Sequence, residues 1–187
     1  QTVVFPAKTM IAAAMNPCKC GFFPDLGRCR CTPTQIRRYL NRVSGPFLDR
    51  IDIGVEVPRQ DLGMMAAEKS IDEGSFPQTE QRNSSAVMRA VMEARVRQEK
   101  RFADESISYN SQMTRRQIEE YCRLSGEDAV FLEKVERQQG ISARGHGKIL
   151  KVARTLADLD GQAEIGRTQL AEAIGFRSFE KKYWGSL

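Results

Sequence analysis

Short unbroken apolar runs mark the beginning of the chain, and the clearest of them is Met10-Ile11-Ala12-Ala13-Ala14-Met15. Such a run is typical of a β-strand buried on both faces, as in a parallel sheet covered by helices. Extended patterns also occur before and after it, so the sequence predicts strands over residues 2–5, 9–15 and 51–57. We therefore expect residues 1–58 to form an α/β unit built on short parallel strands.

One helix is predicted inside this α/β unit. Thr32-Pro33-Thr34-Gln35 has the pattern of a capping box, and Pro33 suits the first helical position. Apolar residues follow at helical spacing: Ile36, Tyr39, Leu40 and Val43. We expect this helix to stop at Gly45-Pro46, since neither residue favours a helix interior.

The second half of the chain has helical periodicity. A charged helix is predicted from Ser84 to about Arg101, and N-cap signals for three further helices stand at Thr114, Ser125 and Ser142. The helix after Ser142 should end at Gly161, and a short last helix is expected over residues 168–174.

The predicted organisation has three parts. Residues 59–83 are acidic and contain Gly, Ser and Pro without a sustained period, which predicts a linker or an insertion. This linker would join the α/β unit, residues 1–58, to a helical domain, residues 84–187. No apolar run is long enough to span a bilayer, so we expect a cytoplasmic protein without membrane contact.

The formal net charge of +5 at pH 7 is concentrated in one segment. Its basic residues are opposed there only by Asp25: Lys19, Arg28, Arg30, Arg37, Arg38 and Arg42. Such a patch suits phosphate, either of a nucleotide or of nucleic acid, but a solvated helix face has a similar composition. The sequence leaves both interpretations open.

Four of the five cysteines lie in the same segment, as Cys18-Lys19-Cys20 and Cys29-Arg30-Cys31. Two close pairs around a short loop can bring four thiolates around one tetrahedral structural zinc. Free or redox-active thiols, or disulfides, are the alternatives that the spacing leaves open. The fifth, Cys122, lies on an apolar helix face and is predicted to be a buried small hydrophobic residue.

A phosphate-cradling loop, Gly-x-x-x-x-Gly-Lys followed by Ser or Thr, does not occur in the sequence. In Gly145-His146-Gly147-Lys148-Ile149 the lysine has the wrong spacing, and Ile149 stands where a magnesium-binding hydroxyl is needed. The chain also begins within a predicted strand. We therefore expect it to be the C-terminal piece of a longer protein.

Several segments, in order along nearly the whole chain, resemble the magnesium-chelatase-like AAA+ ATPases of bacteria, specifically the ComM/YifB family. The matching segments are Phe5-Pro6-Ala7, Ala14-Met15-Asn16-Pro17-Cys18-Lys19-Cys20-Gly21, Cys29-Arg30-Cys31-Thr32-Pro33, Ser44-Gly45-Pro46-Phe47-Leu48-Asp49-Arg50-Ile51-Asp52, Tyr121-Cys122-Arg123-Leu124 and Leu150-Lys151-Val152-Ala153-Arg154-Thr155-Leu156-Ala157-Asp158-Leu159. The resemblance implies the C-terminal part of a P-loop ATPase core followed by a helical lid, with the Walker A and B residues upstream of Gln1.

The resemblance also implies roles for individual residues at a site for ATP and Mg²⁺. Asn16 matches sensor 1, an amide that contacts the γ-phosphate or orients the attacking water. Arg50 matches the arginine finger that reaches a neighbouring subunit's site, with Asp49 holding it in place. Arg144 matches sensor 2, although Ala143-Arg144-Gly145-His146-Gly147 departs from the family's pattern. Lys8 is a candidate DNA contact on a hairpin arm facing the pore.

The function implied is that of a hexameric ring of identical subunits that hydrolyses ATP and acts on DNA, as a helicase in branch migration during competence and recombination. The isolated fragment is expected to be inactive. Two alternatives remain: an ATPase of the magnesium-chelatase type, and a non-catalytic zinc-bearing adaptor that binds nucleic acid or a partner. The Cys-x-Cys pairs argue against the chelatase alternative.

Overall fold

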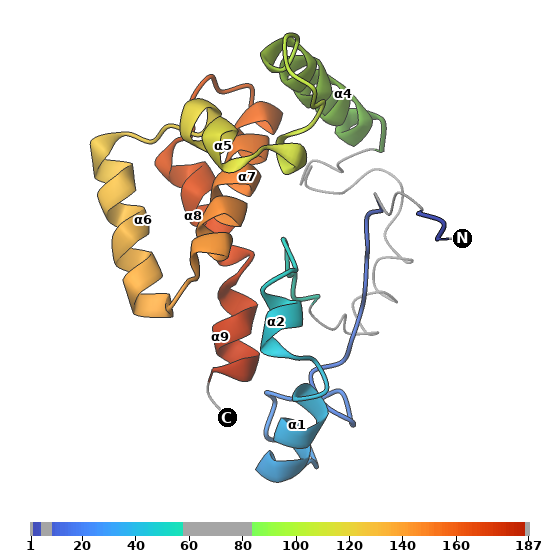
Figure 1. Cartoon of the computed structure of the whole chain (residues 1–187). Helices are drawn as coiled ribbons and strands as arrows, with labels where there is room; N and C mark the ends of the chain where they lie inside the picture. The colour runs from blue at the N-terminus through green and yellow to red at the C-terminus, as the bar shows by residue number, and fades with distance from the viewer. Residues whose placement is uncertain (1, 5–8, 58–83, 186–187) are drawn as a thin grey trace, which may run out of the picture.

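The computed structural model describes residues 2–4, 9–57 and 84–185, and the regular secondary structure within these ranges is helical (Figure 1). In chain order the helices are α1 (Pro33–Leu40), α2 (Gly45–Leu48), α4 (Ser84–Arg101), the 3-10 helix η1 (Asn110–Gln112), α5 (Arg115–Tyr121), α6 (Gly126–Gln139), α7 (Ala143–Leu159), α8 (Arg167–Gly175) and α9 (Ser178–Trp184). The linker predicted at 59–83 lies outside the described residues.

The prediction of an α/β unit with short parallel strands is wrong. The described residues of 2–5, and all of 9–15 and 51–57, contain no strand. Their apolar side chains are open to solvent, as Met10 at 94% and Val57 at 88% exposed illustrate. The pattern predicted burial between helices, but a strand exists only through hydrogen bonds to a neighbouring strand, and the described part of the chain supplies no neighbour.

The N-terminal part of the described chain is a small module, residues 18–42, built around α1. Thr32 and Gln35 form the predicted capping box at its start. Ile36 and Leu40 are buried on one side of α1 and pack with the buried Cys18. The helix ends at Leu40, before the predicted stop, and Gly45-Pro46 instead begin α2, whose N-cap is Ser44.

Helices α4, η1, α5 and α8 pack against α7, which lies at the centre of the bundle, and α6 and α9 pack against α8 (Figure 1). The predicted N-caps Thr114, Ser125 and Ser142 each accept a hydrogen bond from the first turn of α5, α6 and α7. A single apolar core connects these helices, and Cys122 is buried in it, as predicted. These caps and this core fix the position of α7, which carries much of the candidate site.

A buried ionic group lies between α4 and α7. Asp158 is fully buried, and its carboxylate accepts hydrogen bonds from Arg101 Nη1 and from Asn110 Nδ2, each at 2.8 Å. Arg154 Nη2 lies 3.1 Å from the same carboxylate. Burial acts to raise the pKa of Asp158, but the hydrogen bonds from Arg101 and Asn110 and the two positive charges outweigh it and lower the pKa.

Helix α9 connects the bundle to the module of residues 18–42, and it was not predicted. It runs from the end of the bundle past α2 toward α1 (Figure 1). The indole Nε1 of Trp184 donates to the Leu40 carbonyl at 3.0 Å, and Tyr183 packs edge-to-face on Phe23. At its other end, Arg177 donates to the Ile51 carbonyl at 2.8 Å.

The described helices include none long and apolar enough to cross a membrane.

Candidate functional site

Arg50 lies two residues after the end of the short helix α2. Ser44 caps this helix, Pro46 occupies its first turn, and Leu48 is its buried residue. The Arg50 side chain is exposed, and its Nη1 donates to the Pro46 carbonyl at 2.6 Å. A guanidinium has five N–H donors, so this contact leaves donors for a ligand.

Asp49 contacts the first turn of α7 and not the adjacent Arg50. Its Oδ1 accepts a hydrogen bond from Ser142 Oγ at 2.9 Å, and its Oδ2 lies 3.4 Å from Arg144 Nη1. The hydrogen bond from Ser142, and then the Arg144 guanidinium, hold the pKa of Asp49 below its ordinary value. The expected partnership of Asp49 with Arg50 is therefore replaced by one with Arg144.

Arg144 stands in the first turn of α7, where backbone N–H groups and the helix dipole favour an anion. Ser142 Oγ accepts from the Gly145 amide at 3.0 Å while it donates to Asp49. Gly145 is needed here, because a Cβ at this position would lie 2.7 Å from Ile141 Cγ2. At Gly147 a Cβ would meet only Ile118 Cδ1 at 3.5 Å, an ordinary contact.

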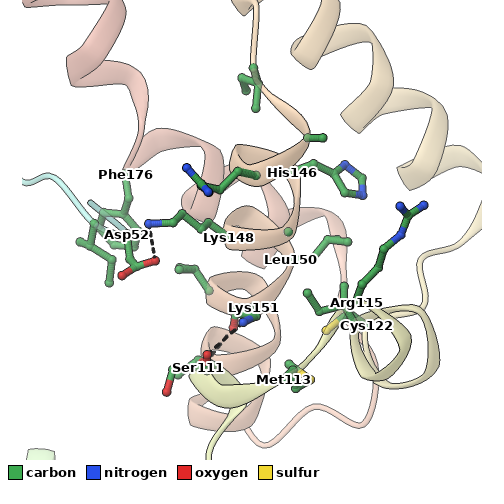
Figure 2. Close-up of a pocket in the computed structure, with 18 of the residues that line it drawn as sticks. Asp52, Ser111, Met113, Arg115, Cys122, His146, Lys148, Leu150, Lys151 and Phe176 are labelled. Atoms are coloured by element: carbon green, nitrogen blue, oxygen red, sulfur yellow. Dashed lines mark hydrogen bonds and ion pairs between the residues drawn. The ribbon is translucent and has the colours of Figure 1, made fainter. Parts of the chain in front are cut away.

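Arg50 and Arg144 line one groove of about 1320 Å³, which runs along α7 between α5 and residues 50–53. Figure 2 shows Lys148 reaching across it to Asp52, with 3.0 Å between Lys148 Nζ and Asp52 Oδ1. Lys148 Nζ also donates to the Arg50 carbonyl. Lys148 therefore connects α7 to the Arg50 backbone, while Asp49 connects α7 to α2.

Further along the groove, other charged residues already have partners. Lys151 donates to the Ser111 carbonyl at 2.9 Å, as Figure 2 shows, and burial lowers its pKa. Arg115 pairs with Glu119 at 3.0 Å. The only histidine, His146, lies 2.6 Å from Glu136 through its Nδ1. Within the described chain the Arg50 guanidinium contacts only the Pro46 carbonyl, and Arg144 is more than half exposed beside its long 3.4 Å contact with Asp49, so both guanidinium groups keep donors for an added anion.

The remaining predicted contacts to nucleotide and DNA, Asn16 and Lys8, are not among the described residues that line this groove. Asn16 is exposed, two residues before Cys18, and the residues that line the groove in the described ranges do not include it. Lys8 lies outside the described residues. The structure thus brings together two of the predicted nucleotide contacts, Arg50 and Arg144, within one chain.

The four cysteines of the module converge, as their spacing predicts. The Sγ atoms of Cys18, Cys20, Cys29 and Cys31 all lie within 4.8 Å of one another. Three separations are 3.3 Å, 3.9 Å and 3.6 Å, for Cys18 to Cys20, Cys18 to Cys29 and Cys20 to Cys29. Tetrahedral zinc with Zn–S bonds of about 2.3 Å requires sulfur atoms about 3.8 Å apart. The four side chains can therefore hold one metal ion.

The chemistry of the four thiols also fits a metal. Hydrogen bonding to the Phe22 backbone lowers the pKa of Cys20 to about 6, even though burial opposes it. At Cys29 the Cys31 backbone acts to lower the pKa, but burial and the neighbouring thiols Cys20 and Cys18 raise it to about 11. The lowered pKa favours the thiolate of Cys20, and a dication would displace the proton that Cys29 retains, since a coordinated thiol is deprotonated. Four protein ligands leave no open position, which is typical of structural metal sites.

Two residues of the site were missed from the sequence. In the sequence Lys148 stands in a segment that fails the phosphate-loop pattern, but its spacing of four from Arg144 places both residues on one face of α7. Asp52 carries no local signal, because its partner Lys148 is 96 positions away in the printed sequence. Contacts of this range follow from tertiary packing and not from local pattern.

Comparison with known proteins gives two matches to family models. Residues 1–65 match the family described as magnesium chelatase, subunit ChlI, and residues 81–177 match magnesium chelatase, subunit ChlI C-terminal.

Among curated proteins, the chain is 39% identical over 178 residues to the competence protein ComM of Haemophilus influenzae, which covers 94% of this chain and 32% of that protein. It is 38% identical over 179 residues to the uncharacterized protein YifB of Escherichia coli, covering 96% of this chain and 33% of that protein. A Mycobacterium tuberculosis protein, Rv2897c, is 30% identical over 173 residues, which are 92% of this chain and 32% of that protein. The chain thus spans about a third of the length of these relatives.

Proposed function

Because this chain belongs to the magnesium-chelatase-like family of ComM and YifB proteins, we propose that the whole protein is an AAA+ ATPase that works as a ring of identical subunits on DNA. The relative named a competence protein suggests the setting, which is branch migration during uptake and recombination of DNA. The substrate would be ATP, with Mg²⁺ as the cofactor.

The observation that carries this proposal is the placement of Arg50 and Arg144. Both guanidinium groups are exposed, both line one groove, and Asp49 and Lys148 tie their segments together. Phosphoryl transfer needs positive charge at the position where negative charge develops on the transferred group. A pair of arginines held on one rigid edge is suited to reach the phosphates of a nucleotide bound by a neighbouring subunit.

Asn16 is proposed to serve a different nucleotide from the one that Arg50 reaches. Its separation from the groove supports this division, in which each subunit offers Asn16 to its own site and Arg50 to its neighbour's. An exposed amide at this position has the donors and acceptors to orient a water molecule toward a γ-phosphate. Lys8 remains a proposed DNA contact.

The cysteine cluster is proposed to hold one structural Zn²⁺, bound by Cys18, Cys20, Cys29 and Cys31. The metal would supply cross-links in a module whose own buried apolar residues are few. Cys18 shares an apolar cluster with Ile36 and Leu40 of α1, and Tyr183 and Trp184 of α9 pack against that cluster. A metal ion at this position would lie beside the contact between α1 and α9.

The first experiment is ATP hydrolysis by the whole protein, measured with and without single-stranded and branched DNA at stated salt. Hydrolysis that DNA stimulates is the expected result. Hydrolysis indifferent to DNA would favour an ATPase of the magnesium-chelatase type, to be checked with protoporphyrin and Mg²⁺. Absence of hydrolysis under all conditions would overturn the motor proposal in favour of a zinc-bearing adaptor.

A further inference from the structure

We propose that the module of residues 18–42 carries a surface that binds the phosphate backbone of nucleic acid. This inference rests on the DNA-directed part of the proposed function and names the surface that meets the DNA. Residues 18–42 contain six basic side chains and a single acidic one, Asp25. Their formal balance equals the net charge of +5 of the whole chain, so the remaining residues are neutral in sum.

The positive charges of this module are not neutralised within the described structure. Arg28 lies 3.7 Å from Asp25, an exposed pair. The other five basic residues form no ion pair with any described acidic side chain: Lys19, Arg30, Arg37, Arg38 and Arg42. In the bundle, by contrast, arginines such as Arg115 and Arg137 pair with acidic residues one turn away.

The fold places these cations on the outside. Helix α1 buries Ile36 and Leu40, so Arg37, Arg38 and the following Arg42 are exposed. Arg42 lies two residues beyond the end of α1, so all three arginines belong to this short stretch of exposed chain.

Lys19 and Arg30 are the middle residues of the two Cys-x-Cys pairs. Because the four sulfur atoms lie within 4.8 Å of one another, these two exposed residues both adjoin the same cluster. Four thiolates around a dication would lower the net charge of the module by two, which leaves it clearly positive. The metal site thus holds the positive side chains in fixed positions without cancelling their charge.

The chemistry of this surface favours nucleic acid over an acidic protein. Most of the cations are arginines, whose planar fork donates two parallel hydrogen bonds to a phosphate. Among the large apolar side chains of the module only Leu26, at 82%, is strongly exposed, whereas protein interfaces centre on buried apolar and aromatic anchors. Phe23 is turned toward Tyr183 of α9 and is not free to stack on bases. The surface is therefore suited to the backbone and not to reading bases.

The test compares two variants of the whole protein that lose equal charge. The first is Arg37→Ala with Arg38→Ala and Arg42→Ala in the module. The control is Arg89→Ala with Arg123→Ala and Lys134→Ala, three exposed cations outside it. Binding to a fluorescein-labelled 30-nucleotide oligo(dT) is followed by anisotropy from 50 to 300 mM salt. Zinc content and the melting temperature establish that each variant is folded.

The module variant should bind about 10-fold more weakly and its logarithmic salt slope should fall by about two, because single strands release about 0.7 counterion per neutralised phosphate. The control should change affinity less than about 2-fold, and ATP hydrolysis without DNA should stay unchanged in both. Equal losses in the two variants, or none in the first, would overturn the proposal. Competition by poly-glutamate as strong as that by poly(dT) would assign the surface to an acidic protein instead.

The outcome for this surface is separable from that for the motor. A protein that hydrolyses no ATP but loses oligonucleotide binding in the module variant would keep the surface and lose the motor. Hydrolysis that DNA stimulates equally in the wild type and in the module variant would keep the motor and lose the surface.

Discussion

Asp49 and Arg144, 95 positions apart in the sequence, form an ion pair with 3.4 Å between Asp49 Oδ2 and Arg144 Nη1. This pair joins the segment that presents Arg50 to the helix that presents Arg144. Ser142 strengthens the link, since its hydroxyl both caps α7 and donates to Asp49. The two candidate phosphate contacts are therefore positioned by one shared carboxylate.

Replacing Asp49→Asn should lower ATP hydrolysis by the whole protein about 10-fold, because misplacing a positioning group by a fraction of an ångström weakens transition-state contacts. The stability should fall by less than about 1 kcal/mol, because the pair is partly exposed. Steady-state kinetics and thermal unfolding measure the two effects. Glu133→Gln, which removes the Arg137 pair on α6, is the matched control and should change neither. Normal hydrolysis by Asp49→Asn would show that Arg144 needs no such partner.

Arg50→Ala should leave ATP binding nearly intact and reduce hydrolysis by about 10³-fold or more, as expected for a finger that acts only in the transition state. Binding of a fluorescent ATP analogue and phosphate release measure the two steps separately. Arg115→Ala removes another groove arginine, one that is already paired with Glu119, and should retain hydrolysis within about 2-fold. Unchanged turnover in Arg50→Ala would remove this residue as a finger.

The two glycines of α7 should respond to alanine in opposite directions. Gly147→Ala should raise the free energy of unfolding by up to about 1 kcal/mol, because the new Cβ makes an ordinary contact and alanine favours helix. Gly145→Ala should lower it, since its Cβ would lie 2.7 Å from Ile141 Cγ2. Thermal and urea unfolding of the two variants measure these changes in the free energy of unfolding. Stabilisation by both substitutions would contradict the close approach of residue 145 to Ile141 in the first turn of α7.

The cysteine cluster should bind one equivalent of zinc, measured by elemental analysis of the purified protein. Cys29→Ser with Cys31→Ser should abolish binding and change the fluorescence of Trp184, the only tryptophan, because α9 packs on the same cluster. Cys122→Ala serves as the control: it removes a buried thiol from the other core and should lower stability while zinc stays bound. A metal-free wild-type protein of equal stability would refute the zinc site.

Acid should destabilise the helical bundle through Asp158. Its pKa is lower in the folded than in the unfolded protein, so its contribution is complete above the ordinary aspartate pKa of about 4 and is lost as the pH falls through the folded value. Asp158→Asn leaves Arg101 and Arg154 without their buried counter-charge and should cost about 3 kcal/mol at pH 7. Melting curves from pH 3 to 7 should show a smaller acid dependence in this variant than in the wild type. An identical pH dependence would assign acid sensitivity to other carboxylates.

The features predicted correctly from the sequence are those set by neighbours in the chain. In each predicted N-cap the side-chain hydroxyl accepts a hydrogen bond from the backbone amide three residues later, so the local sequence is sufficient to predict it. These caps are Thr32, Thr114, Ser125 and Ser142. The meeting of the four cysteines followed from their spacing in the same way. Such contacts need no knowledge of the remaining fold.

The features that were wrong or missed depend on distant partners. An apolar run such as residues 9–15 predicts burial, but the sequence does not record whether another strand lies beside it. Gly45-Pro46 reads equally as the end of one helix and the beginning of the next. Helix α9 begins at Ser178, and its N-cap residue Arg177 makes no side-chain capping hydrogen bond, so the local sequence carries no start signal for this helix.

Helix α9 also sets a practical limit on dividing this protein. The match to the C-terminal family model stops at residue 177, and α9 begins at Ser178. A chain cut at that boundary would keep the bundle core but lose Tyr183 and Trp184, which cover Phe23 and hold the Leu40 carbonyl. Boundaries chosen from sequence families would thus remove the helix that joins the cysteine module, residues 18–42, to the helical bundle.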